Sequence, residues 1–86
     1  MAREKKLVQK MLNRPGDMML EEINRVLTSF GYDLFNQRGS HSTYVNNLGQ
    51  QIVVVATNGR IVTKNYIKRV VDLLNLEEWY NEQEPE

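Results

Sequence analysis

The feature that most constrains the fold is a change in the spacing of apolar residues along the chain. In residues 17–31 they recur every three or four positions, at Leu20, Ile23, Leu27 and Phe30. This spacing places an apolar stripe on one side of a helix. In residues 32–57 β-branched and aromatic residues form short runs separated by turn residues, which is typical of strands. Helical spacing returns after residue 63, so the sequence predicts a helix, a group of strands and a second helix.

Residues at the ends of these segments predict where each helix begins and ends. We expect Asp17 to cap the first helix and Gly31 to end it in a left-handed conformation. Thr63 is expected to cap the last helix, whose apolar stripe consists of Ile67, Val70, Val71 and Leu74. A similar stripe in residues 3–13 predicts a short N-terminal helix, broken by Pro15-Gly16.

Three strands are expected, at residues 32–38, 41–46 and 51–56. Tight turns at residues 38–40 and 46–49 join them, which predicts an antiparallel meander. Two helices can cover one face of such a sheet. We therefore predict an α+β two-layer sandwich with a three-stranded antiparallel sheet, one helix before it, one after it and a short extra N-terminal helix. The other sheet face, or the rim near the turns, is then open for a ligand.

Composition excludes several classes of protein. The 86 residues contain no cysteine and one histidine, which excludes disulfides, thiolate metal sites and cysteine nucleophiles. One imidazole without a carboxylate cluster does not make the usual metal site, so no metal and no cofactor are expected. No apolar run approaches the ~20 residues that span a membrane, and no signal-peptide segment is seen. We expect one soluble, cytoplasmic domain.

Charge is distributed unevenly along the chain. The totals balance at eleven basic and eleven acidic residues, but five of the acids lie in residues 77–86, where no basic residue occurs. Residues 1–76 therefore carry a net charge of about +5, which suggests a polyanionic partner. We divide the chain into an N-terminal helical extension (1–16), a main domain (17–76) and an acidic, solubilising C-terminal tail (77–86). An alternative role for the tail is to compete with nucleic acid for the basic face.

The only histidine, His41, lies in Arg38-Gly39-Ser40-His41 between two expected strands. Histidine exchanges a proton near neutral pH, glycine permits a close backbone approach, and arginine supplies a fixed positive charge. Each of these residues also has a purely structural interpretation, because glycine and serine are common turn residues and most surface cations are simply solvated. Tyr44 can stack on a base or pack across the sheet. Lys64 is a second candidate for phosphate contact.

These residues resemble the HicA toxins, also called the YcfA-like family. The resemblance covers residues 27–32, Arg38-Gly39-Ser40-His41 with Tyr44 following, and residues 58–71. It implies a double-stranded-RNA-binding-like fold and cleavage of messenger RNA by His41. It also implies a HicB-type antitoxin that blocks the site. Arg38, Gly39, Ser40, Tyr44 and Lys64 are the candidate RNA-binding residues. Many members carry Pro-x-His near the end of the third strand, whereas this chain reads Val55-Ala56-Thr57, so His41 has no imidazole partner.

RNA supplies its own nucleophile, the 2′-hydroxyl, so a metal-free enzyme needs only two proton transfers and stabilisation of charge on phosphorus. A single histidine can perform one of the two transfers, which predicts a slow ribonuclease. Two other functions stay open. One is a non-catalytic RNA-binding module of the same fold, and the other is a protein-binding partner without nuclease activity.

Overall fold

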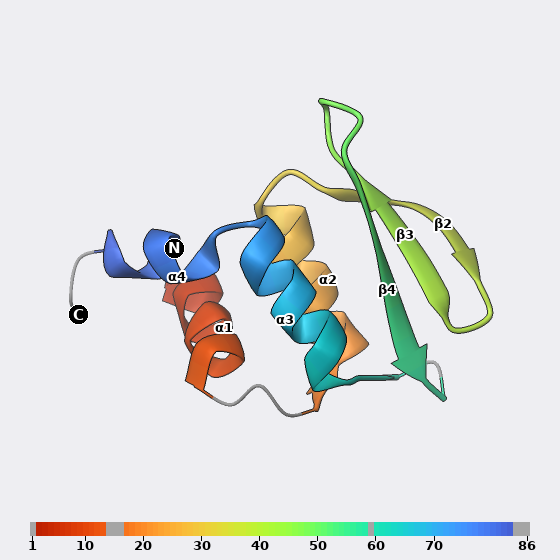
Figure 1. The fold of residues 1–86 in the computed structure, drawn as a ribbon, viewed down its shortest axis with the longest axis horizontal. Coiled ribbons are helices and arrows are strands. Elements are labelled where there is room, and N and C mark those ends of the chain that lie inside the picture. The colour runs from red at the N-terminus through yellow and green to blue at the C-terminus, as the bar shows by residue number, and fades with distance from the viewer. Residues whose placement is uncertain (1, 14–16, 59, 84–86) are drawn as a thin grey trace.

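The computed structural model describes residues 2–13, 17–58 and 60–83, with side chains from Lys5 onward. The predicted α+β class is confirmed: the described residues contain helices and a single antiparallel sheet (Figure 1). In chain order the elements are α1 (Ala2–Asn13), β1 (Met18–Met19), α2 (Leu20–Ser29), β2 (Asp33–Arg38), β3 (His41–Val45), β4 (Gln51–Thr57), β5 (Ile61–Val62), α3 (Lys64–Leu73) and α4 (Leu76–Asn81).

The sheet has five strands in the order β1-β5-β4-β3-β2, so the expected count of three strands is wrong. The three long strands form the predicted meander, with β3 antiparallel to both β2 and β4. The two additional strands have two residues each, and they pair Met18 with Val62 and Met19 with Ile61. A strand of two residues leaves no alternating pattern in a sequence, which is why the prediction missed both.

The first residues of α2 differ from the prediction, and its end agrees with it. Met19, not Asp17, occupies the N-cap position. Met18 and Met19 are paired with β5 as a strand, so the helix begins only after them. A carboxylate oxygen of Glu22 accepts a hydrogen bond of 3.0 Å from the Met19 N–H. At the other end Gly31 has φ +90 and donates its N–H to the Thr28 carbonyl. Gly31 therefore ends the helix in the left-handed conformation that the sequence predicts.

The helices are stacked two deep on one side of the sheet, which extends the predicted two-layer arrangement. Helices α2 and α3 lie next to the sheet, and α1 and α4 lie on their far side (Figure 1). Helix α4 forms where a charged tail was expected, and its first residue, Leu76, is completely buried. The half-buried Trp79 packs edge-on against Phe30, with ring centroids 5.2 Å apart. Residues 84–86 of the expected tail, and the Pro15-Gly16 break, lie outside the described residues.

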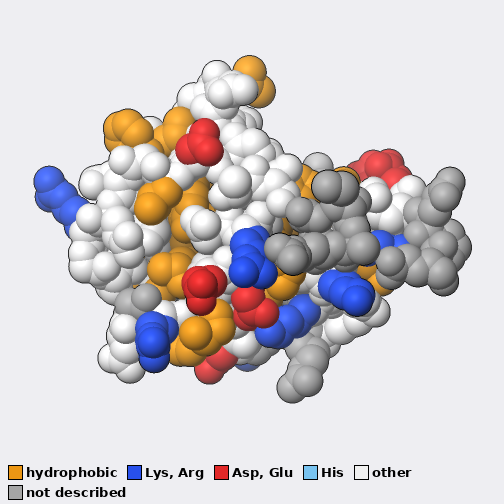
Figure 2. Space-filling model, turned by 180° about the vertical axis from the view of Figure 1, so that it is seen from behind, with side chains coloured by type: hydrophobic (Ala, Val, Ile, Leu, Met, Phe, Trp, Pro, Cys, Tyr) orange, Lys and Arg blue, Asp and Glu red, His pale blue; other side chains and the backbone are white. Residues whose placement is uncertain are grey.

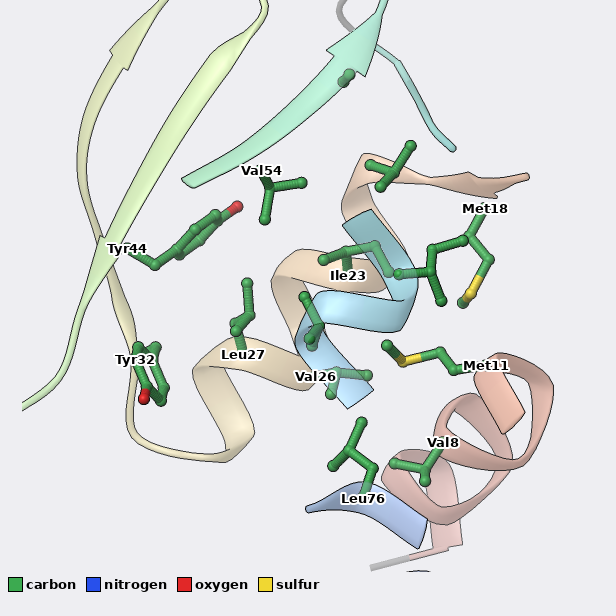
Figure 3. Close-up of a cluster of buried hydrophobic side chains, with 14 residues drawn as sticks. Val8, Met11, Met18, Ile23, Val26, Leu27, Tyr32, Tyr44, Val54 and Leu76 are labelled. Carbon is green, nitrogen blue, oxygen red and sulfur yellow. The ribbon is translucent and has the colours of Figure 1, made fainter. Parts of the chain in front are cut away.

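One hydrophobic core joins the four helices with β1, β3, β4 and β5, whereas every residue of β2 is exposed (Figure 3). Its members come from the expected N-terminal extension as well as from the central domain: Val8, Met11, Met18, Ile23, Val26, Leu27, Tyr32, Tyr44, Val54, Ala56, Val62, Ile67, Val70 and Leu76. Among the described helices, none combines the length and the apolar character required to cross a membrane.

Candidate functional site

The candidate site begins at the turn between β2 and β3. Gly39 and Ser40 form a two-residue connection in which Arg38 is paired with His41. Gly39 has φ +55 and Ser40 does not have a positive φ, which is the pattern of a type II′ hairpin turn. A Cβ added at Gly39 would meet no atom within 4 Å, so glycine is required here for its conformation and not for space. The Ser40 carbonyl also accepts a hydrogen bond of 2.9 Å from the Ala56 N–H, which attaches the turn to β4.

His41 points to the open face of the sheet. Burial alternates along β3: Ser42 and Tyr44 are buried against the helices, whereas His41 is exposed. Because neighbours in a strand point to opposite faces, the imidazole lies on the side that no described helix covers. Neither ring nitrogen has a hydrogen-bond or ion-pair partner among the described residues. The ring is therefore accessible to a ligand on that face.

The residues around His41 follow from the strand register. Directly paired residues share a face, so Arg38 on β2 and Val55 on β4 flank the imidazole. The next paired rows on this face contain Asn36, Thr43 and Val53, and then Asp33, Val45 and Gln51. Among these paired residues Arg38 is the only base and Asp33 the only acid. The open face thus carries one well-placed cation beside His41 and has little net charge.

Tyr44 does not belong to this face, and the proposed stacking of its ring on a base is wrong. The side chain is 1% exposed and points from the sheet toward the helices (Figure 3). Its hydroxyl donates a hydrogen bond of 2.9 Å to Oδ1 of Asn24 in α2. Burial raises the pKa of Tyr44 above its ordinary value, which keeps the phenol neutral. In this structure Tyr44 is a core residue.

Lys64 is also separated from His41. It is the first residue of α3, directly after Thr63, which occupies the N-cap position as expected but makes no capping hydrogen bond with its side chain. It follows β5, two strands away from β3 in the sheet. Together with Met11 and Lys68 it borders a hollow of about 480 Å³ between α1 and α3. Lys64 therefore lies on the helix side of the sheet, while Arg38 and His41 lie on the open side.

Sequence reasoning did not identify Ser42, the only buried polar residue in the described part of the chain, at 1% exposed. It precedes Tyr44 by two positions and therefore shares its face. Once Tyr44 is assigned to the core, this spacing predicts that Ser42 is buried as well. No group of three or more His, Asp or Glu side chains that could hold a metal occurs within the described ranges.

No protein-family model, no curated protein and no solved structure matches this chain. The assignment of a function therefore depends on the motif around His41 and on the geometry of the open face.

Proposed function

We propose that the protein is a HicA-type toxin, a cytoplasmic endoribonuclease that cleaves messenger RNA without a metal and uses His41 as its one acid–base group. The observation that carries this proposal is the position of His41. The imidazole is exposed, has no partner among the described residues, and lies directly opposite Arg38 across a tight turn.

The arrangement of α2, β2, β3, β4 and α3 supports the proposal. A helix, a three-stranded meander and a second helix are the order that a double-stranded-RNA-binding-like fold requires, and both helices pack on one side of the meander. We interpret β1 and β5 as a two-residue addition at the β4 side of that meander. The opposite face then presents His41 to RNA.

The proposed reaction is a transfer within the RNA strand. The 2′-oxygen loses its proton and attacks phosphorus, the bond from phosphorus to the 5′-oxygen breaks, and that oxygen takes up a proton. The products are a 2′,3′-cyclic phosphate and a 5′-hydroxyl. His41 performs one proton transfer, water performs the other, and the Arg38 guanidinium binds the phosphate oxygens. The backbone amides of Gly39 and Ser40 are candidates for further phosphate contacts.

A HicB-type antitoxin is the partner that this proposal implies. The open face suits a protein partner because, among the described residues paired there, Arg38 and Asp33 are the only ones with a fixed charge and the others are uncharged, such as Val53, which is 40% exposed. A protein bound there would cover His41 and Arg38 together and so prevent access of RNA.

The second candidate is an RNA-binding module without catalytic activity. The observation that favours it is that neither residue paired directly with His41, Arg38 on β2 or Val55 on β4, is an imidazole or carboxylate that could serve the other proton transfer. Such a module would still bind RNA through Arg38 and the turn.

Expression in a bacterial host separates the two candidates. We expect induction of the wild type to stop growth and to shorten messenger RNA, and we expect His41→Ala, made at the same level, to do neither. His41 is exposed, so this substitution should leave the fold intact, and Lys68→Ala on α3 serves as the matched surface control. Equal growth arrest by wild type and His41→Ala would contradict catalysis by His41.

A further inference from the structure

A second hollow lies behind the hairpin, on the opposite side of β3 from His41. It has a volume of about 340 Å³ and is open to solvent between the N-terminal half of α2 and the inner face of β2 and β3. Its polar side chains are those of Glu21, Asn24, Gln37, Ser42, Tyr44 and Arg60. We call it the hairpin pocket.

The strongest indication of a ligand is the Ser42 side chain. It lines the hairpin pocket and is 1% exposed, yet its hydroxyl has no hydrogen-bond partner among the described residues. Buried hydroxyls in folded proteins nearly always have a partner, because the loss of hydration is otherwise uncompensated. A ligand with a polar edge would supply the missing partner.

The rest of the lining combines hydrogen-bonding groups with apolar walls. Oδ1 of Asn24 accepts the Tyr44 hydroxyl, which leaves the Asn24 amide nitrogen available as a donor. Leu34 is 48% exposed and belongs, with Leu20, to the apolar part of the lining. Figure 2 shows the molecule from the side of α2, where hydrophobic side chains form a band between the hairpin and the helices. Apolar walls with polar groups at a few points are suited to a flat heterocycle.

We propose that the hairpin pocket binds one nucleobase of the RNA substrate, with guanine preferred; this inference rests on the proposed function. Glu21 is the only carboxylate in the lining, and it can accept hydrogen bonds from the two N–H groups on the Watson–Crick edge of guanine. Arg60 and the Asn24 amide can donate to the O6 acceptor of the base. Adenine, cytosine and uracil do not combine two adjacent N–H groups with a neighbouring carbonyl on that edge.

The pocket is close enough to His41 for one RNA strand to reach both. Ser42 follows His41 in β3, and Gln37 precedes Arg38 in β2. Ser42 and Gln37 line the pocket, while the neighbouring His41 and Arg38 lie on the open face. β2 is the edge strand of the sheet, and adjacent strands are about 4.8 Å apart. RNA with a phosphate beside His41 can therefore bend around β2 and insert a neighbouring base from behind.

Nucleotide binding to the full-length His41→Ala protein tests this proposal. The probes are the 5′-monophosphates of guanosine, adenosine, cytidine and uridine, with ribose 5-phosphate as the control for phosphate alone. Binding is followed by amide chemical shifts in NMR spectra. We expect the guanosine nucleotide to bind about tenfold more tightly than the others and to shift the amides of Leu34, Ser42 and Arg60.

Two substitutions and one matched control locate the binding. Glu21→Gln and Ser42→Val should each weaken guanosine nucleotide binding about fivefold or more, whereas Glu78→Gln on α4 should not change it. Because Glu21 is exposed, its variant tests the pocket even if Ser42→Val fails to fold. Equal affinity for all four bases, identical shifts with ribose 5-phosphate, or no shift at the pocket would overturn the proposal.

The result of the nucleotide-binding experiment does not depend on RNA cleavage, because the protein used carries the substitution His41→Ala. Guanosine nucleotide binding by a protein whose wild type cuts no RNA would support the pocket and contradict the ribonuclease. Cleavage of RNA by the wild type, without binding of the guanosine nucleotide, would support the ribonuclease and contradict the proposed role of the pocket.

Discussion

The Tyr44 hydroxyl and Oδ1 of Asn24 are joined by a hydrogen bond of 2.9 Å that ties the middle of β3 to α2. Tyr44 is 1% exposed, so its face of β3 packs toward the helices. Because side chains alternate along a strand, His41, three positions earlier, lies on the open face. The orientation of the candidate catalytic residue therefore follows from the packing of Tyr44 in the core.

Removal of this hydrogen bond should destabilise the protein moderately. We expect Tyr44→Phe to lower the free energy of unfolding by about 1 kcal/mol, measured by urea denaturation. The matched control is Tyr66→Phe, because Tyr66 is half-buried and its hydroxyl forms no hydrogen bond with any described residue. A loss no larger than that of the control would show that the hydroxyl contributes nothing to the orientation of β3.

A salt bridge between α1 and α2 should make stability depend on pH. Nζ of Lys10 lies 2.7 Å from Oε2 of Glu22. Burial raises the pKa of Glu22, but hydrogen bonds from Lys10 and the Met19 N–H, with the charges of Lys10 and Arg25, outweigh it, and the net pKa lies below the ordinary value of 4.5. This contribution is present above about pH 4.5 and is lost as the pH falls through the lower folded-state pKa.

We therefore expect Glu22→Gln to lower the free energy of unfolding by about 0.5–1 kcal/mol at neutral pH, since Lys10 is well exposed. The difference from the wild type should shrink as the pH falls below 4.5 and disappear once Glu22 is protonated in the folded state. Glu21→Gln is the control from the same helical turn and should change stability by less than about 0.5 kcal/mol. A deficit for Glu22→Gln that is unchanged in acid would rule out the ion pair as its cause.

Gly39 should be sensitive to substitution even though it has free space around it. An L side chain at φ +55 is strained, so Gly39→Ala should cost about 1–2 kcal/mol of stability. It should also reduce RNA cleavage, because the turn positions Arg38 opposite His41. Ser40→Ala in the same turn is the control. Stability is measured by thermal unfolding and activity by RNA cleavage. Equal stability and equal cleavage for Gly39→Ala and Ser40→Ala would contradict the requirement for a positive φ at residue 39.

Arg38 should contribute to RNA affinity through phosphate alone. We expect Arg38→Ala to weaken binding to single-stranded RNA equally for all sequences and to reduce the slope of log affinity against log salt by about 0.7. Filter binding across a range of salt concentrations measures both quantities. Lys68→Ala, which removes a cation on the helix side, should leave the slope unchanged. An unchanged slope for Arg38→Ala would remove this residue from the RNA contact.

The fold could be predicted where a single residue type determines the local backbone. Gly31 ends α2, Thr63 precedes α3, and the Gly39-Ser40 turn separates two strands, all as their sequence signals indicate. Where pairing depends on distant residues, prediction failed. Met18 and Met19 form a strand only because residues 61–62 lie beside them, and this pairing moves the helix cap from Asp17 to Met19.

The candidate site was predicted in part, for similar reasons. Arg38 and His41 meet because a two-residue turn fixes the register between them. The face to which Tyr44 and Ser42 point depends on which side the helices cover, and no local signal carries that information. Likewise, α4 becomes a packed helix because Leu76 and Trp79 reach the core, although acidic residues suggested a tail.

Cleavage of RNA by the purified protein in the presence of a metal chelator is the most direct test of catalysis by His41. We expect the wild type to produce 2′,3′-cyclic phosphate ends under these conditions. We also expect His41→Ala, with an unchanged NMR spectrum outside the hairpin, to be slower by about 100-fold or more. Cleavage that requires a metal, or that proceeds at the same rate without the imidazole, would contradict the assignment of His41 as the catalytic residue.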